Sequence, residues 1–530
     1  MSELNPVDVD LGLDLGTGGP SWVAIDQETG RVIGVGKGPK FPDDVCEHDP
    51  QIWEDGVVQA MQALHADLKG KGRQIKQVGR IGLTGMMHGE VLIGSDGKAI
   101  GLARLWNHPS NTEQGRELTE KFGVKFPTRL TASRFYWTAY NQQDKAQAAV
   151  MLATPTIYLF WLMTGEHIGG IGECSGMFPI DPKTGAYFPE MLEEYDRLIN
   201  DPKIKPMGEL LPCPKRAGET IFQLNQEWAE KLGLPVGALF APPEGDQEAA
   251  LAASLISQPG KIAFAGGTSV CANAVCAELF KGVHPAVDHF LDANGTPINM
   301  VWLKNGTVFT NWVVAQAFSL FQKIKPHIKE DEVWQILTEM ALATPADCKG
   351  LWGLPFMAPE PGLGFGHGGV AFIAGMRGGK ESNADYGAIF RLSFLLTLFG
   401  VKHGIDVLLE QGCKFNEIII TGGVANSPEL MGQMIADVLN MPARIRKSAN
   451  EGGALGGAYL ARFSRLKTAN PGLTYDQFMA NMLGEESGQV FTPDTAAGAA
   501  YTDMYEAGYR DMLVVEQNLL EAGCFHNRLA

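Results

Sequence analysis

The sequence has few cysteines, and they form no pairs with metal-binding or redox spacing. The 530 residues include eight cysteines and no CxxC motif. Such sparse cysteines are typical of reduced thiols in a cytosolic protein, and they exclude a disulfide-stapled scaffold or a zinc-finger module. The acidic start, MSELNPVDVDLG, lacks the apolar core of a secretory signal. We therefore expect a cytoplasmic protein.

Positive charge is also scarce. The chain has 43 Lys and Arg residues against 60 Asp and Glu, which gives a net charge of −17. Nucleic-acid-binding domains normally present a cluster of basic residues, so we expect no nucleic-acid partner. The acidic balance does not exclude ATP, because backbone N–H groups and Mg²⁺ can hold phosphates in an acidic protein.

Long hydrophobic runs are nearly absent. The uncharged stretch at 146–165 has the length of a membrane span, but Pro155 and several threonines interrupt it, and no second span follows. We predict a buried helix there and no membrane partner.

Glycine is abundant, with 64 residues, and 45% of the chain is hydrophobic. This composition is typical of a large α/β protein with many tight turns. The opening reads as strand, turn at 28–30, and strand, followed by a helix over 53–68. The run LGLDLGTGG resembles the later run IAFAGGTSV, which indicates a weak internal duplication. We predict two α/β lobes that join near residues 243–260.

The segment 14–19, Asp-Leu-Gly-Thr-Gly-Gly, is the first motif with chemical meaning. A predicted strand delivers Asp14 and then turns on glycines, so backbone N–H groups and the Thr17 hydroxyl can face phosphate oxygens. The Asp14 carboxylate could bind Mg²⁺. The alternative is an ordinary hairpin with a surface aspartate.

The segment 244–247, Glu-Gly-Asp-Gln, places Asp246 at a strand-to-helix corner. A carboxylate at this position can simply cap the helix. It can also accept the proton of an attacking hydroxyl during phosphoryl transfer. The sequence leaves both interpretations open.

Two further glycine turns could contact a nucleotide. One is 266–269, Gly-Gly-Thr-Ser, which could hold phosphates from the second lobe. The other lies within 421–439, where Gly422 and Gly423 would let a flat base approach the backbone. Asn426 or Ser427 could instead cap the following helix.

Taken together and in order, these motifs resemble the FGGY carbohydrate kinases, and among them most of all the xylulokinases. The resemblance extends over roughly residues 9–462. Its pieces are short and collinear: 14–19, 47–53, 85–107, 163–166, 244–247, 265–269 and 421–442.

The resemblance implies the roles of individual residues. Asp246 would be the catalytic base and would also contact the sugar and the metal, and Asp14 would be the other Mg²⁺-binding carboxylate. The remaining sugar contacts would be Met87, His88, Trp106 and Asn107. The ATP contacts would be Gly16, Thr17, Gly267, Thr268, Asn311, Gly422, Gly423 and Asn426. For His88 the alternative is a buried structural histidine.

The chain departs from the family pattern in two places. After Trp106-Asn107 the family continues with Asp-x-Arg, whereas this chain has His108-Pro109-Ser110. The glycine-rich stretch 353–379 also lacks the family's Gly-Glu-Arg pattern. These departures affect the identity of the sugar, because discrimination among sugars depends on which hydroxyl groups find partners.

The expected fold, implied by the resemblance, is two ribonuclease-H-like lobes of the actin/hexokinase/Hsp70 ATPase superfamily around a central cleft. Residues 1–250 would form the sugar-binding lobe and residues 251–530 the ATP-binding lobe. The expected reaction is phosphorylation of a small ketose by MgATP, with D-xylulose as the first choice and a homodimer among the expected assemblies. The alternatives are a kinase for ribulose, erythritol or a glycerol-like polyol, and a catalytically inactive nucleotide-binding relative.

A rival from another class is an NAD-dependent oxidoreductase. The segment 364–369 fits GxGxxG, which in a dinucleotide-binding fold follows a strand and opens a helix. The residues that follow, VAFIAGMRGG, predict a strand and a loop, so we expect no dinucleotide site there.

Overall fold

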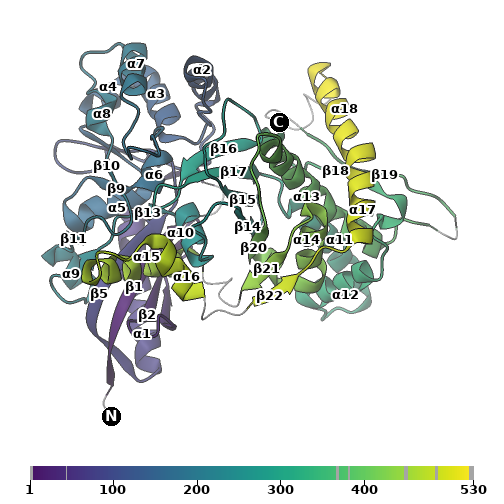
Figure 1. Ribbon diagram of the computed structural model, residues 1–530, viewed down its shortest axis with the longest axis horizontal. Helices are drawn as coiled ribbons and strands as arrows, with labels where there is room; N and C mark the ends of the chain where they lie inside the picture. Colours follow the sequence, from purple (N-terminus) through teal and green to yellow (C-terminus); the bar gives the residue numbers. More distant parts are fainter. Residues whose placement is uncertain are drawn as a thin grey trace.

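The computed structural model describes residues 4–42, 45–365, 369–379, 382–446, 452–483 and 488–523. They form two α/β lobes side by side, each built on its own seven-stranded sheet (Figure 1). Both lobes have large buried hydrophobic clusters. The predicted α/β two-lobe class is confirmed.

The first sheet has the order β11-β12-β5-β1-β2-β3, with β13 beside β5. Its strands are β1 (Asn5–Gly16), β2 (Gly19–Asp26), β3 (Val32–Lys37), β5 (Arg73–Gly85), β11 (Phe222–Gln223), β12 (Leu239–Phe240) and β13 (Glu244–Gly245). Residues alternate between its two faces. Trp22 packs on helix α1 (Gln51–Gly70), where its indole N–H donates to the Val57 carbonyl, and Val23 packs with Leu455 of α15 (Gly452–Ala469).

The second sheet has the order β16-β17-β15-β14-β20-β21-β22. Its strands are β14 (Lys261–Gly266), β15 (Val270–Val275), β16 (Val287–Leu291), β17 (Pro297–Leu303), β20 (Glu417–Gly422), β21 (Ala443–Arg446) and β22 (Gly488–Phe491). β14 is antiparallel to β15 and parallel to β20, just as β1 is antiparallel to β2 and parallel to β5. The predicted duplication is therefore visible in the strand pairing.

The other helices surround the sheets (Figure 1). In the first lobe they are α2 (Thr112–Phe122), α3 (Thr131–Asn141), α4 (Gln143–Ala148), α5 (Pro155–Thr164), α6 (Ile171–Ser175), α7 (Pro189–Ile199), α8 (Met207–Leu210), α9 (Gln226–Leu232) and α10 (Asp246–Ala253). In the second lobe and beyond they are α11 (Val308–Ile324), α12 (Glu330–Leu342), α13 (Tyr386–Glu410), α14 (Gln433–Leu439), α16 (Tyr475–Leu483), α17 (Thr495–Met504) and α18 (Arg510–Glu521).

Short strands complete the first lobe. They are β4 (Glu47–His48), β6 (Val91–Ile93), β7 (Ala103–Arg104), β8 (Met151–Ala153), β9 (Ile168–Gly170) and β10 (Cys213–Lys215). The prediction of one buried helix over 146–165 is wrong in its first half. There β8 pairs with β6, and α5 begins only at Pro155, capped by the Thr154 hydroxyl. Proline favours the first helical turn because it has no N–H to donate.

Helix α13 is the one helix in the described ranges that is long and apolar enough to cross a membrane. Its best window is 72% buried. It packs against α11 and α12 in the second lobe, as a core helix does.

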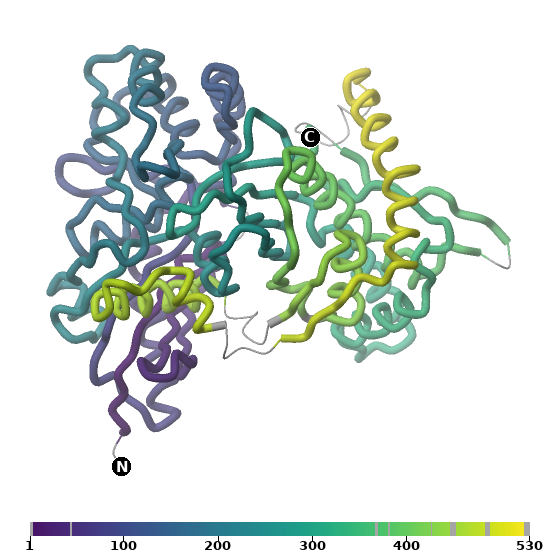
Figure 2. Tube along the Cα trace, viewed as in Figure 1, coloured from purple at the N-terminus to yellow at the C-terminus, as the bar shows by residue number. Residues whose placement is uncertain are grey.

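Helix α15 follows β21 of the second sheet but packs on the first lobe, as the yellow-green segment in Figure 2 shows, and β22 then returns to the second sheet. Its backbone lies directly on the first sheet. A Cβ atom on Gly12 would lie 1.9 Å from the Ala454 carbonyl oxygen, and one on Gly82 would lie 2.0 Å from that of Gly457. This explains the small residues of the helix. The division of the chain at residue 250 stays a prediction.

Candidate active site

Two half-buried carboxylates lie where strand ends of the first sheet meet. Asp14 is near the end of β1, and its ladder partner in β5 is Thr84. Thr84 also pairs with Glu244 of β13, two residues before Asp246. Since β1, β5 and β13 run parallel, their carboxyl ends share one edge, which is where ligands bind in open α/β sheets. The two aspartates predicted from the sequence are brought to the same edge.

The surroundings of these carboxylates favour their protonated forms. Burial, and then the negative charge of Asp246, raise the pKa of Asp14 to about 7. Burial raises the pKa of Asp246 to about 6, although hydrogen bonds from Gln247 offset part of the rise. A base with a pKa near 6 is ionised at neutral pH and still binds a proton well.

Asp246 is linked to the second lobe through its neighbour. The Gln247 Nε2 atom donates to Asp246 Oδ1 (3.2 Å), and the Asn273 Nδ2 atom of β15 donates to Gln247 Oε1 (2.9 Å). Asp246 is the first residue of α10, and Gly245 holds the N-cap position. The carboxylate is therefore anchored from both lobes.

The first glycine turn lies beside these carboxylates. Gly16 and Gly19 close the β1–β2 hairpin, and the Trp106 indole N–H donates to the Thr17 hydroxyl (3.2 Å). The start of α15 is pressed against Asp14, since a Cβ atom on Gly453 would lie 2.7 to 2.9 Å from the Asp14 carboxyl atoms. Of the predicted sugar contacts, Asn107 is exposed, and its amide donates to the Val45 carbonyl (3.0 Å).

The other predicted nucleotide contacts gather at one edge of the second sheet. A Cβ atom on Gly422 would lie 2.7 Å from the Gly266 carbonyl oxygen, so the turns after β14 and β20 touch. The Gly267 carbonyl accepts from the Thr307 N–H (2.8 Å) and hydroxyl (2.9 Å), and the Asn311 amide donates to that hydroxyl (3.4 Å).

Gly423 and Asn426 bound the short helix η3 (Gly423–Asn426) that follows β20, and Thr268 lies in the turn after β14. The Asn426 side chain lies outside the described part of the chain. The second-lobe members of the predicted set therefore lie close together, and their contact with a nucleotide stays a prediction.

Met87, the first residue of the Met87-His88 pair, lies beside Gly245, which precedes Asp246. A Cβ atom on Gly245 would lie 2.3 Å from Met87 Cγ. His88 is buried and has a positive φ of 64°, and its Nδ1 atom lies 2.7 Å from the Gly176 carbonyl oxygen. Burial, and then the charge of Arg129, lower the His88 pKa to about 3, so the ring is neutral.

Sequence reasoning missed a basic pair next to His88. The Arg129 Nε atom donates to His88 Nε2 (3.2 Å), and its guanidinium also bonds to Asp288 of β16. The Lys125 Nζ atom lies 2.7 Å from Asp288 Oδ1. Both basic residues lie in the loop between α2 and α3, where isolated cations gave no motif.

Sequence reasoning also missed a group of buried glutamates behind Asp246. Glu173, Glu244 and Glu248 are all fully buried or nearly so, and the pKa of each is raised, first by burial. For Glu244 the value is about 8. The Glu173 N–H donates to Glu244 Oε2 (2.9 Å). We therefore expect protonated carboxyl groups here at neutral pH.

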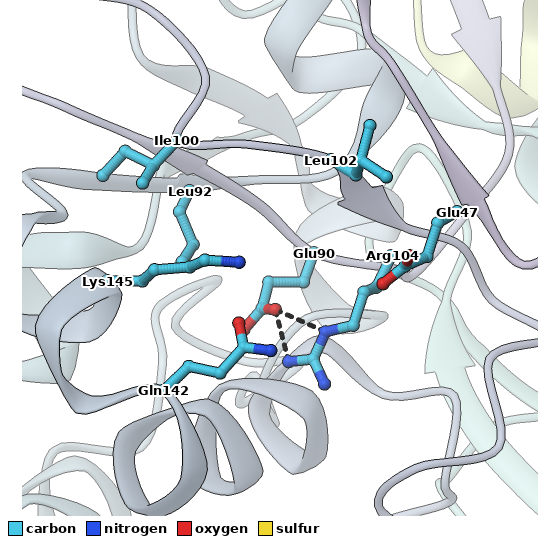
Figure 3. Close-up of a pocket in the computed structure, with 8 residues that line it drawn as sticks. All are labelled: Glu47, Glu90, Leu92, Ile100, Leu102, Arg104, Gln142 and Lys145. Atoms are coloured by element: carbon cyan, nitrogen blue, oxygen red, sulfur yellow. Dashed lines mark hydrogen bonds and ion pairs between the residues drawn. The ribbon is translucent and has the colours of Figure 1, made fainter.

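A buried guanidinium–carboxylate pair does exist near the sugar motif, although not at the family's Asp-x-Arg positions. Arg104 pairs with Glu90, and the pair lines a cavity of about 250 Å³ in the first lobe (Figure 3). Nearby, Arg134 donates to the carbonyls of Trp106 (2.6 Å) and His108 (3.0 Å). Arg134 thereby holds the turn that replaces the family's Trp-Asn-Asp-x-Arg segment.

The GxGxxG segment precedes a strand, as predicted. Residues 366–368 lie outside the described part, but β19 (Ala371–Ala374) follows and pairs with β18 (Trp352–Pro355). A dinucleotide fingerprint would open a helix at this place. A strand follows the segment where an NAD-dependent oxidoreductase would have a helix, so the structure does not support that interpretation.

Comparison with known proteins agrees with this geometry. The model of the FGGY family of carbohydrate kinases, N-terminal domain, matches residues 9–253, and that of the C-terminal domain matches residues 262–464. A xylulose kinase of Haemophilus influenzae is 25% identical over 86% of this chain and 90% of its own length.

Solved structures share the fold. A xylulose kinase of Rhodospirillum rubrum has a TM-score of 0.77 at 20% identity, covering 97% of this chain and 99% of that one. The ligand-bound xylulose kinase of Lactobacillus acidophilus has a TM-score of 0.79 at 17% identity, covering 97% and 99%. With both family domains matched in order over most of its length, the chain belongs to the FGGY family of carbohydrate kinases, and it is an ATP-dependent sugar kinase.

Proposed function

We propose that the protein transfers the γ-phosphate of MgATP to a hydroxyl group of D-xylulose. The observation that carries this proposal is the position of Asp246, a half-buried carboxylate at the strand edge that also holds Asp14, directly after Gly245, which Met87 contacts. The curated relatives named xylulose kinase support the choice of sugar.

In the proposed reaction Asp246 acts as the general base. The sugar hydroxyl oxygen attacks the γ-phosphorus and forms the new O–P bond, while the bond to the ADP oxygen breaks. The hydroxyl proton passes to the Asp246 carboxylate. A pKa of about 6 suits this role, because the carboxylate is ionised at neutral pH.

Mg²⁺ would be held by Asp14 and Asp246. The two carboxylates are close enough for the charge of Asp246 to raise the pKa of Asp14, so the pair favours a cation. Within the described ranges no group of three or more His, Cys, Asp or Glu side chains has metal-binding geometry. Mg²⁺ commonly binds through one or two carboxylates together with substrate phosphates, and when bound it screens the phosphate charge.

ATP would contact both glycine turns. Gly16 and Thr17 would face its phosphates from the first lobe, and Gly267 and Thr268 from the second. The Gly422-Gly423 turn would lie along the adenosine. Because Gly422 touches Gly266, the adenosine and phosphate contacts would form one continuous surface.

A different acceptor remains a candidate because this chain replaces the family's Trp-Asn-Asp-x-Arg segment. Ribulose, erythritol and glycerol are the acceptors to compare. A catalytically inactive relative is the other alternative, and the presence of both aspartates counts against it. We also propose that the protein is cytoplasmic. We further propose that it forms a homodimer, and analytical ultracentrifugation would test this oligomeric state.

The test is ADP release from MgATP with each candidate sugar. Wild type, Asp246→Asn and the surface control Asp96→Asn should be run together; Asp96 is exposed in the turn after β6. We expect sugar-dependent release that Asp246→Asn lowers by roughly a hundredfold or more, within the range of general-base catalysis. Release that the substitution leaves unchanged would refute the assigned base, and no release with any sugar would favour the inactive relative.

A further inference from the structure

The hydrogen bonds around His88 use both of its ring nitrogens. The neutral ring places its proton on Nδ1, which donates to the Gly176 carbonyl, and Nε2 accepts from Arg129 Nε. A histidine in this arrangement has no ring nitrogen left for a sugar hydroxyl. Arg129, which bonds to His88 Nε2, still has N–H groups without an acceptor among the described residues.

Arg129 bonds to protein through only part of its guanidinium. Nε donates to His88 and Nη2 bonds to Asp288, while among the described residues no acceptor lies within hydrogen-bond geometry of Nη1. The side chain keeps 15% of its surface exposed, so the free N–H groups can be reached by a small molecule. Since Nη1 has no protein acceptor and is not sealed inside the protein, its N–H groups are open to a polar ligand.

The surroundings of Arg129 place it in the reaction site. The guanidinium lies 5.2 Å from the centre of the Trp302 ring on β17. Trp302 pairs with Cys271 of β15, and two residues further along β15 Asn273 donates to Gln247, the neighbour of Asp246. Arg129, which bonds to His88, and Asp246 therefore lie next to the same part of the second sheet.

The guanidinium is held in a fixed orientation from both lobes. His88 belongs to the first lobe, and Asp288 belongs to β16 of the second. Lys125 pairs with the other oxygen of Asp288, so this carboxylate is shared between the two basic residues. A planar guanidinium fixed at two points presents its remaining donors in one direction.

We propose that Arg129 is a specificity-determining residue that hydrogen-bonds oxygen atoms of the acceptor sugar, and that His88 positions Arg129 instead of contacting the sugar. In this chain Arg129 thereby supplies the guanidinium that is missing after Trp106-Asn107. This inference rests on the proposed sugar kinase activity.

The first test compares Arg129→Met with Arg444→Met. Arg444 pairs with Glu417 at the start of β20, the opposite end of that strand from Gly422. In Arg129→Met we expect the KM for sugar to rise about tenfold to a hundredfold, as when a charged hydrogen bond is lost, with the KM for MgATP unchanged. The melting temperature should fall, because Asp288 keeps only Lys125 as a partner, so both KM values are measured well below it. Arg444→Met should change neither KM. An unaltered sugar KM in Arg129→Met would overturn the proposal.

The second test separates positioning from contact at His88. His88→Gln keeps an amide that can donate to Gly176 and accept from Arg129, so it should retain most of the sugar affinity, whereas His88→Leu should lose it. Adding His88→Leu to Arg129→Met should raise the sugar KM by less than about twofold. Effects that multiply in the double variant would show that His88 contacts the sugar itself and would overturn its positioning role.

The outcomes also separate this inference from the proposed function. If wild type releases ADP in a sugar-dependent way and Arg129→Met has the same KM for sugar, the inference is overturned and the proposed kinase activity stands. Absence of sugar-dependent release by wild type would overturn both.

Discussion

At the scale of single residues, the site is dominated by carboxyl groups that burial keeps from ionising easily. Asp14 and Asp246 are half-buried and Glu244 is fully buried, and their pKa values rise to about 7, 6 and 8. The types and positions of the two aspartates were predictable from the motifs. Glu173, Glu244 and Glu248 were not, because only the folded chain brings α6, β13 and α10 together.

The pH dependence of the reaction should report Asp246. Only the ionised carboxylate can accept the hydroxyl proton, so kcat/KM for the sugar should rise with pH and level off, with its acidic limb between about pH 6 and 7. The measurement is a pH profile at constant ionic strength. A flat profile from about pH 5 to 8 would contradict the assignment of the base.

Replacing Glu244 by Gln should stabilise the protein at alkaline pH. The folded pKa of Glu244, about 8, lies above its unfolded value of 4.5, so the unfolded chain loses the proton first and wild-type stability falls as pH rises towards 8. Glutamine has no proton to lose. The melting temperature of Glu244→Gln relative to wild type should therefore increase from pH 5 to pH 8. An advantage that shrinks over this range would refute the raised pKa.

At the scale of elements, the site depends on how α15 approaches β1. The glycine-rich sequence of this helix predicted close packing, and Gly456 confirms it, since a Cβ atom there would lie 2.0 Å from the Ala249 carbonyl oxygen. The sequence did not predict which sheet the helix covers. Its position between β21 and β22 of the second sheet suggests the second lobe, whereas its face of small residues fits against Gly12 and Gly82 of the first lobe.

Gly453→Ala should impair catalysis. The added methyl group would lie within 2.9 Å of the Asp14 carboxyl atoms and would displace them. We expect kcat to fall by roughly tenfold or more, in line with the sensitivity of reacting groups to small displacements.

The control for Gly453→Ala is Gly508→Ala, where an added Cβ meets nothing within 4 Å. Steady-state kinetics and thermal melting of both variants provide the comparison. If Gly453→Ala has the kcat of wild type, the start of α15 does not position Asp14.

At the scale of the whole molecule, two sheets share the same strand pairing, and in each an antiparallel pair of strands is joined by a glycine turn. The repeated strand–turn pattern predicted this duplication, and the collinear motifs predicted the family. The residues that join the lobes were beyond sequence reasoning. Asp288 of β16 forms ion pairs with Arg129 and Lys125, which lie 159 and 163 residues earlier in the chain. No local sequence pattern links these residues.

The most direct test of the central claim is analysis of the products formed from D-xylulose and MgATP by ³¹P NMR and mass spectrometry. A sugar kinase predicts one phosphate monoester of the sugar for each ADP formed, with little inorganic phosphate. Inorganic phosphate in equal amount to ADP would show that water is the acceptor, and it would contradict the proposed sugar phosphorylation.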